Sequence, residues 1–145
     1  MLIWVALALV TAKWRSALLY GTPWSWLPAV PLFAAGFWLY VRSGKHFSAK
    51  QLGGVPELMP GHREQMLVTS GIHARVRHPV YLAHLCELLA WSFGTGLVVL
   101  YVLTLFALVT GAVMLRVEDA ELEQRFGADY VAYRQRVPAI LPWLI

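Results

Sequence analysis

One polar stretch of the sequence concentrates residue types that could bind a ligand or move a proton. It runs from Gln65 to Tyr81 as QMLVTSGIHARVRHPVY and stands between long apolar runs. Its side chains of this kind are His73, Arg75, Arg77, His78 and Tyr81. Ionisable side chains at the mouth of a membrane segment are costly to place there, so their presence indicates a functional site.

A second group of ionisable residues follows the last long apolar run, in RVEDAELEQRF. On a helix, Leu115, Leu122 and Phe126 form a stripe, and Glu118 and Asp119 flank that stripe. These two acids are therefore turned towards the buried side, whereas the other two acids of the run point further outward. For Glu118 we favour a functional role, because a carboxylate there can accept hydrogen bonds from a ligand.

A third ionisable pair, His84 and Glu87, lies inside an apolar run. Glu87 falls about 10 Å beyond Val80 at the helical rise of about 1.5 Å per residue. At that depth an unpaired charge would cost several kcal/mol, so we expect Glu87 to be neutral or paired. Two explanations stay open: a contact with His84 or another helix that stabilises the bundle, or a role in binding a substrate headgroup or moving a proton.

The composition predicts the scaffold that must position these groups. Among 145 residues, 59% are hydrophobic and only 14% are charged, whereas soluble domains have about 25% charged residues. This indicates an all-α integral membrane protein with about four spans, too short to add a soluble catalytic domain of typical size. The net charge of +4 is then first a topology signal, and nucleic acid is a poor alternative partner.

The apolar runs predict spans at about 2–20, 24–41, 80–93 and 97–115, with an uncharged turn at Gly94 to Gly96 joining the last two. The first run is interrupted by Lys13 and Arg15, so it either spans with these cations at the headgroup layer or lies partly in the interface. Its opening, MLIWVALALV, has no basic residue before the apolar core and no clear cleavage site after it. We therefore expect this segment to stay in the chain.

The distribution of cations predicts the orientation. The connection 42–79 has six Lys and Arg residues against two acids, and the segment 116–145 contains further arginines. By the positive-inside rule both are cytoplasmic, as are both termini. Lys13 and Arg15 then fall on the opposite side, which conflicts mildly with this topology.

Two separated motifs resemble those of a known family. The run GIHARVRHPVYL, followed after two apolar helices by VEDAELEQRFGADYVAYRQRVPAILP, is similar to the isoprenylcysteine carboxyl methyltransferase family and to its relatives among the phospholipid methyltransferases. The resemblance covers roughly residues 47–142. It implies a membrane enzyme that takes a methyl group from S-adenosylmethionine, with short carboxyl-terminal helices closing over a cofactor pocket at the cytoplasmic face.

The resemblance also implies which residues bind the cofactor. By motif position these are Gln65, Met66, Leu67, Val68, His73, His78, Pro79, Val80, Tyr81 and Glu118. Their chemistry is suitable, since a carboxylate can bind ribose hydroxyls or an amine, and an aromatic ring can stabilise a sulfonium cation. No metal is implied. Methyl transfer is an in-line displacement, so the protein mainly positions the acceptor and excludes water.

For the acceptor, the sequence offers Arg116, Arg77 and Arg75 as orienting cations and His78 or Glu87 as proton acceptors. A carboxylate acceptor needs an orienting cation, whereas an amine or thiol must lose a proton. We expect a lipophilic acceptor, such as an isoprenylcysteine-like carboxylate or another lipid-like molecule, that enters from the bilayer.

Three positions depart from the family pattern: His73 replaces a tyrosine, Ala83 a glycine, and Met114 the arginine that engages the substrate carboxylate. Arg116 lies two residues further along, about 200° round the helix. The alternatives are therefore a phospholipid N-methyltransferase, a thiol methyltransferase or a non-catalytic scaffold of the same fold. The sequence leaves the oligomeric state open.

Overall fold

A computed structural model describes residues 5–6, 9, 12, 15–44 and 66–140. Over these residues the protein is all-helical, and the only β-type pairing among them is an isolated bridge between Leu18 and Leu97. The elements, in chain order, are η2 (Pro23–Ser25), α2 (Trp26–Gly44), η4 (Gly71–Ala74), α4 (Pro79–Thr95), α5 (Val98–Phe126) and α6 (Ala128–Arg136). The all-α prediction is confirmed for this part of the chain.

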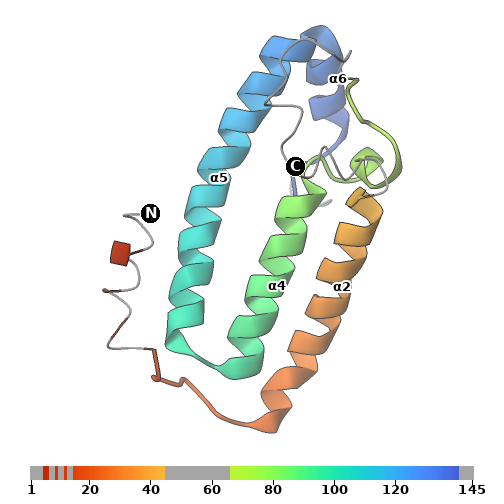
Figure 1. The fold of residues 1–145 in the computed structure, drawn as a ribbon. Helices are drawn as coiled ribbons and strands as arrows, with labels where there is room; N and C mark the ends of the chain where they lie inside the picture. Colours follow the sequence, from red (N-terminus) through yellow and green to blue (C-terminus); the bar gives the residue numbers. More distant parts are fainter. Residues whose placement is uncertain (1–4, 7–8, 10–11, 13–14, 45–65, 141–145) are drawn as a thin grey trace.

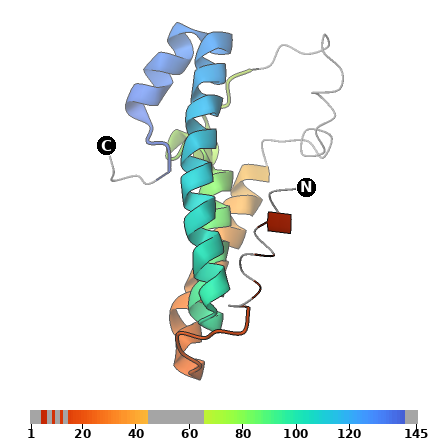
Figure 2. The same cartoon turned by 90° about the vertical axis from the view of Figure 1, so that its left-hand side faces the viewer.

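The three long helices α2, α4 and α5 stand side by side in one layer, with α6 folded back at the upper end (Figure 1). Turned by 90°, the layer is seen edge-on (Figure 2). Helices α2 and α4 pack most extensively, and a glycine allows this close approach. A Cβ on Gly36 of α2 would lie 3.2 Å from the Ala83 carbonyl oxygen of α4.

The predicted turn between the third and fourth apolar runs is present. Helix α4 ends at Thr95, and Gly96 adopts a left-handed conformation with φ 69°. A Cβ on Gly96 would lie 2.3 Å from the Tyr20 carbonyl oxygen, so only glycine fits here. Above the turn, the buried hydroxyls of Ser92 and Thr104 lie 2.9 Å apart and join α4 to α5.

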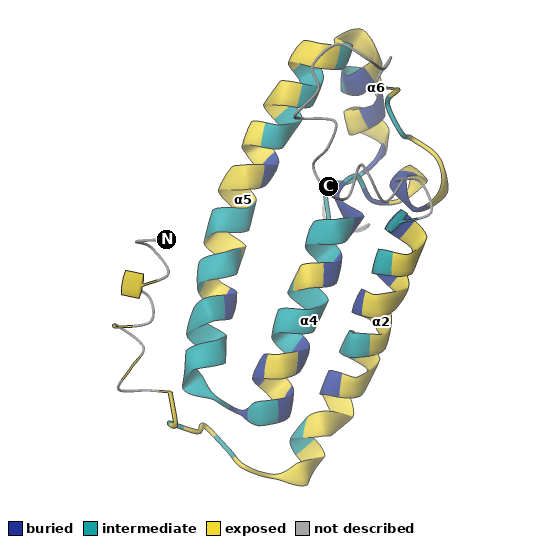
Figure 3. Ribbon diagram, in the orientation of Figure 1, coloured by how far each residue is buried: buried dark blue, intermediate teal, exposed yellow. Residues whose placement is uncertain are grey.

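Two helical segments are long and apolar enough to cross a membrane, Pro23–Gly44 and Val98–Phe126. Large apolar residues of α2 and α5 are exposed, among them Phe37 and Leu105, and exposed positions recur along both helices (Figure 3). Exposed apolar faces on long helices are what contact with lipid requires. The structure thus supports a membrane protein, and the expectation of four spans stays a prediction.

The helices extend beyond the predicted spans. The run expected at 80–93 forms α4 from Pro79 to Thr95, and the run at 24–41 continues as α2 to Gly44. The largest difference is at 97–115, because α5 continues to Phe126 without a break. Only its first part, 98–115, is uncharged, so hydropathy predicted the end of the apolar segment and not the end of the helix. The first part of the predicted carboxyl-terminal segment 116–145, residues 116–126, is therefore the distal end of α5.

The expectation that the first apolar run is helical to Tyr20 is wrong. Of the described residues before position 21, Val5, Ala6 and Leu9 are helical, whereas 15–20 are not. The backbone there pairs with the α4–α5 turn, since Leu19 N–H donates to the Gly96 carbonyl at 2.8 Å and the carbonyl of residue 17 accepts from Val98 N–H at 3.0 Å. These groups are thus unavailable for helical hydrogen bonds.

We call the described segment after α5, residues 128–140, the cap. It begins after Gly127, which has φ 55° and ends α5. Helix α6 then runs back towards the start of α4 (Figure 1). A small apolar core holds α6 in place. Its members are Tyr130, Tyr133 and Val137, with Leu67, Leu122 and Phe126 packed against them. Leu67 therefore ties the segment before α4 to the cap.

Candidate functional site

One carboxylate oxygen at the distal end of α5 gathers three hydrogen-bond donors from different parts of the chain. Asp119 Oδ1 accepts from Arg77 Nη1 at 2.6 Å, from His78 Nε2 at 2.8 Å and from the Tyr130 hydroxyl. Arg77 and His78 precede α4, whereas Tyr130 lies on α6. With Glu118, these residues form what we call the Asp119 cluster: Arg77, His78, Glu118, Asp119 and Tyr130.

The His78 ring lies between two acids. Its Nε2 faces Asp119 and its Nδ1 lies 3.4 Å from Glu118 Oε2. The His78 side chain is only 4% exposed, compared with 44% for Glu118. Burial lowers the pKa of His78, but the hydrogen bonds to Glu118 and Asp119 outweigh it and raise the pKa above its ordinary value. Hydrogen bonding to the two acids thus favours the protonated form of His78.

Asp119 has the opposite shift. Burial raises the pKa of its carboxyl, but hydrogen bonds from Arg77, Tyr130 and His78 more than offset this, so the pKa lies below its ordinary value. Burial and the bond to Asp119 raise the pKa of the Tyr130 phenol. Near neutral pH the cluster therefore holds Asp119 ionised and Tyr130 as a donor.

Arg77 fastens the segment before α4 to the end of the chain. Its Nε donates to the Val137 carbonyl at 3.0 Å and its Nη1 to the Tyr130 hydroxyl at 2.9 Å. The backbones pair too, because Arg77 N–H donates to the Pro138 carbonyl and His78 N–H to the Ala139 carbonyl, both at 2.9 Å. Two nitrogens of the guanidinium, Nε and Nη1, are thus engaged in structural hydrogen bonds.

His73 lies buried in η4, next to the same junction. The Tyr133 hydroxyl of α6 donates to the His73 carbonyl at 2.6 Å. The His73 Nδ1 lies 3.2 Å from the Arg77 carbonyl. The position where the family pattern has tyrosine is therefore part of the same cap junction.

The structure brings most of the described predicted residues to one end of the molecule. Pro79 is fully buried at the start of α4, and the Tyr81 ring meets the His78 ring edge-on at 5.9 Å. Leu67 and Val68 are half-buried, and Val80 is half-buried one residue after Pro79.

Other predicted residues lie apart from the cluster. Met66 is 84% exposed, and Gln65 is outside the described residues. Arg116 is exposed on α5, about 200° round the helix from Glu118. Glu87 is half-buried on α4, about 13 Å along the axis from His78. Its Cγ lies against Gly36 of α2, where an added Cβ would approach it to 3.2 Å.

Sequence reasoning gave no role to two members of the cluster, Asp119 and Tyr130. The helical stripe did turn Asp119 towards the buried side. The signal that could have linked Asp119 to other residues is this inward direction itself, because a buried carboxylate needs a cation or hydrogen-bond donors as partners.

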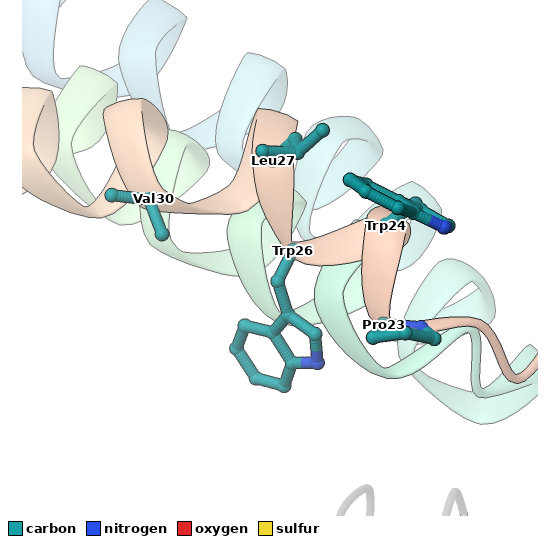
Figure 4. A pocket seen from close by; sticks show the side chains of 5 residues that line it. All are labelled: Pro23, Trp24, Trp26, Leu27 and Val30. Carbon is teal, nitrogen blue, oxygen red and sulfur yellow. The ribbon is translucent and has the colours of Figure 1, made fainter.

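A hollow of about 290 Å³ lies at the opposite end of α2 from the cluster. Its lining is almost wholly apolar (Figure 4): Pro23, Trp24, Trp26, Leu27 and Val30. Two indoles at the end of a span are typical of the membrane interface. This hollow has no acid or cation in its lining and does not belong to the site.

Comparison with known proteins identifies the scaffold. A family model described as phospholipid methyltransferase matches residues 24–129, from η2 to the start of α6. The chain belongs to the phospholipid methyltransferase family. The match includes the first predicted motif, the first half of the second up to residue 129, and four of the five residues of the Asp119 cluster, all except Tyr130.

Curated relatives refine this placement. The chain is 33% identical over 108 residues to a protein-S-isoprenylcysteine O-methyltransferase of Schizosaccharomyces pombe, covering 71% of this chain and 44% of the relative. For the mouse protein of the same name the identity is 30% over 129 residues, which cover 83% of this chain and 43% of the relative. For protein-S-isoprenylcysteine O-methyltransferase B of Arabidopsis thaliana the identity is 36% over 83 residues, which cover 54% of this chain and 40% of the relative. The predicted resemblance is confirmed, although the chain spans less than half the length of these relatives. No solved structure matches it.

Proposed function

We propose that this protein is a membrane methyltransferase that uses S-adenosylmethionine and acts on a lipophilic acceptor. The observation that supports this best is the position of Glu118 within the region matched by the family. Its carboxylate is 44% exposed and is anchored on one side by the buried His78 ring. Such a carboxylate has a structural partner on one side and is still accessible to a ligand.

The residues around Glu118 suit the proposed cofactor. The Glu118 carboxylate can accept hydrogen bonds from ribose hydroxyls or an amine, and the Tyr81 ring next to His78 can face a sulfonium. Leu67, Val68 and the exposed Met66 supply apolar surface for an adenine. When bound, the cofactor supplies a methyl group already activated by positive sulfur.

The arrangement bears on the acceptor as well. Both nitrogens of His78 face carboxylates, so this ring is not available as a general base. Arg77 is engaged by Asp119 and by two further acceptors, so its role is to position the site. An acceptor that is already anionic needs no base, and we propose a lipophilic carboxylate or an easily ionised thiol ahead of an amine.

Cofactor binding is tested by calorimetry on purified protein in detergent. We expect saturable binding of S-adenosylmethionine that Glu118→Ala weakens at least tenfold, the loss of a charge-assisted hydrogen bond worth about 1.5–3 kcal/mol. Glu121→Ala is the matched control, since Glu121 is 66% exposed on the same helix and should change affinity less than twofold. No binding by the wild type, or equal affinity in both variants, would refute the proposal.

The acceptor is tested with cofactor carrying a radiolabelled methyl group. The panel contains prenylcysteine analogues, ethanolamine lipids and hydrophobic thiols. Base-labile label indicates an ester and therefore a carboxylate acceptor, whereas stable label indicates an amine or thioether product. Label on the ethanolamine lipids alone would contradict the preference for an anionic acceptor.

We also propose that the cluster faces the cytoplasm, because the connection 42–79 has six cations against two acids. Reporter enzymes fused to the carboxyl terminus test this. A reporter active only in the cytoplasm should be active, and one active only outside should be inactive.

A further inference from the structure

The Asp119 cluster contains a chain of contacts that runs from a nearly buried acid to a half-exposed one. Asp119, 17% exposed, contacts His78 Nε2 at 2.8 Å. The opposite ring nitrogen, Nδ1, lies 3.4 Å from Glu118, which is 44% exposed. His78 itself is 4% exposed, so the ring connects the interior of the cap to the accessible carboxylate.

The geometry selects one charge state of this ring. A neutral imidazole has a single N–H, and the other nitrogen is then an acceptor. An acceptor nitrogen facing a carboxylate is unfavourable, whereas an imidazolium donates towards both acids. The other groups facing the ring are the Tyr81 ring of α4 at 5.9 Å and, through Asp119, Arg77 and Tyr130.

Asp119 is the fixed end of this chain of contacts. Arg77 and Tyr130 hold its Oδ1 from two other parts of the fold, and Arg77 is itself bound to the Val137 carbonyl at 3.0 Å. Glu118 has greater freedom, because its side chain is half-exposed. The direction of control therefore runs from Asp119 through His78 to Glu118.

We propose that Asp119 is a positioning residue that keeps His78 as an imidazolium. Through the His78 Nδ1–H, it fixes the direction of the Glu118 carboxylate for binding a cofactor. The cofactor part rests on the function proposed above. Asp119 does more, on this view, than fasten the cap: it sets the charge and orientation of a ring that reaches the ligand side.

Nitrogen NMR of ring-labelled histidine in detergent tests the charge state directly. The chain has five histidines, and the His78 signals are assigned by their loss in His78→Gln. At pH 7.5 we expect both ring nitrogens of His78 to be protonated in the wild type. Asp119→Asn keeps a side chain of the same shape but removes the charge, and it should convert His78 to the neutral ring.

Two variants separate positioning from fastening. Tyr130→Phe removes two hydrogen bonds that hold the cap, to Asp119 and from Arg77, but keeps the Asp119 charge, so His78 should stay protonated. Glu123→Gln removes another carboxylate that ties α5 to α6, through its 2.8 Å pair with Arg134, and should leave the His78 signals unchanged. If Asp119→Asn also leaves them unchanged, or if all three variants neutralise His78, the proposal is overturned.

Calorimetry with S-adenosylmethionine completes the test. We expect Asp119→Asn to lower affinity about tenfold and Glu123→Gln to change it less than twofold. If His78 becomes neutral in Asp119→Asn while cofactor affinity is kept, the proposed control of Glu118 is overturned. Failure of the proposed function looks different, since even the wild type would then bind no cofactor while the NMR change on Asp119→Asn remained.

Discussion

Replacing Arg77 by methionine should loosen the cap without changing the helices of the layer. Methionine keeps most of the apolar stem but removes the donors to Asp119 at 2.6 Å, to Tyr130 at 2.9 Å and to the Val137 carbonyl at 3.0 Å. The Arg77 side chain is 9% exposed, so water cannot fully replace it.

The loss of cap stability depends on which hydrogen-bond donors Asp119 keeps. Removing one partner of a buried ion pair costs about 3–5 kcal/mol when the other charge is left alone. Asp119 keeps His78 and Tyr130 as donors, so we expect the lower part of this range or slightly less, about 2–3 kcal/mol. That corresponds to an increase in cap opening of about 30-fold to 150-fold, since about 1.4 kcal/mol is tenfold.

Hydrogen exchange of α6 amides, followed by mass spectrometry in detergent, measures this opening. The matched control is Arg125→Met, because Arg125 is 46% exposed and pairs with Glu121 at 3.7 Å. Such an exposed pair contributes about 0–1 kcal/mol, so exchange should rise less than about fivefold. Equal effects of the two variants would show that the buried ion pair does not hold the cap.

Three further outcomes are expected. The pKa of Asp119 is lowered from 3.8, so this residue stabilises the cap above pH 3.8 and loses the effect as the pH falls through its folded pKa. The pKa of His78 is raised from 6.5, so this residue stabilises the cap below pH 6.5 and loses the effect as the pH rises through its folded pKa. Protection of α6 amides, corrected for intrinsic exchange, should thus be greatest between about pH 4 and 6.5 and decrease above it, and protection that still increases above pH 7 would contradict this. Gly94→Ala should destabilise the protein by about 1–3 kcal/mol in thermal unfolding, because its Cβ would lie 2.8 Å from the Trp26 ring; an unchanged midpoint would mean that the indole moves freely. Glu87→Gln should change cofactor affinity less than twofold, since Glu87 lies about 13 Å along α4 from His78, and a tenfold loss would place it in the pocket.

The sequence predicted the helices of the layer best where apolar runs end in charges or glycine. Helix α4 and the turn at Gly96 follow from such ends. Hydropathy failed for the first run, because residues 17–19 pair with the α4–α5 turn. That pairing depends on a segment about 80 residues away, which no local pattern contains.

The sequence indicated some members of the Asp119 cluster but not the contacts that join them. Glu118 and His78 stand out because they are ionisable residues within motifs. Arg77 was explained by the positive-inside rule, which was sufficient by itself and concealed its ion pair with Asp119. The two residues are 42 positions apart, so a helical stripe can show that Asp119 faces inward but cannot name its partner.

The charge of the Asp119 cluster gives a physical reason for this architecture. Two cations, Arg77 and His78, are matched by two carboxylates, Glu118 and Asp119. The proposed cofactor carries a sulfonium, an ammonium and a carboxylate, and is therefore a net cation. Without Asp119, the Arg77 cation would be unpaired and would repel the cofactor at the edge of a low-dielectric layer, where charge interactions are strong. Asp119 removes this repulsion without occupying the ligand side, which leaves the half-exposed Glu118 carboxylate free to attract the cofactor. Loss of the Asp119 charge should therefore weaken cofactor binding even if Glu118 keeps its place.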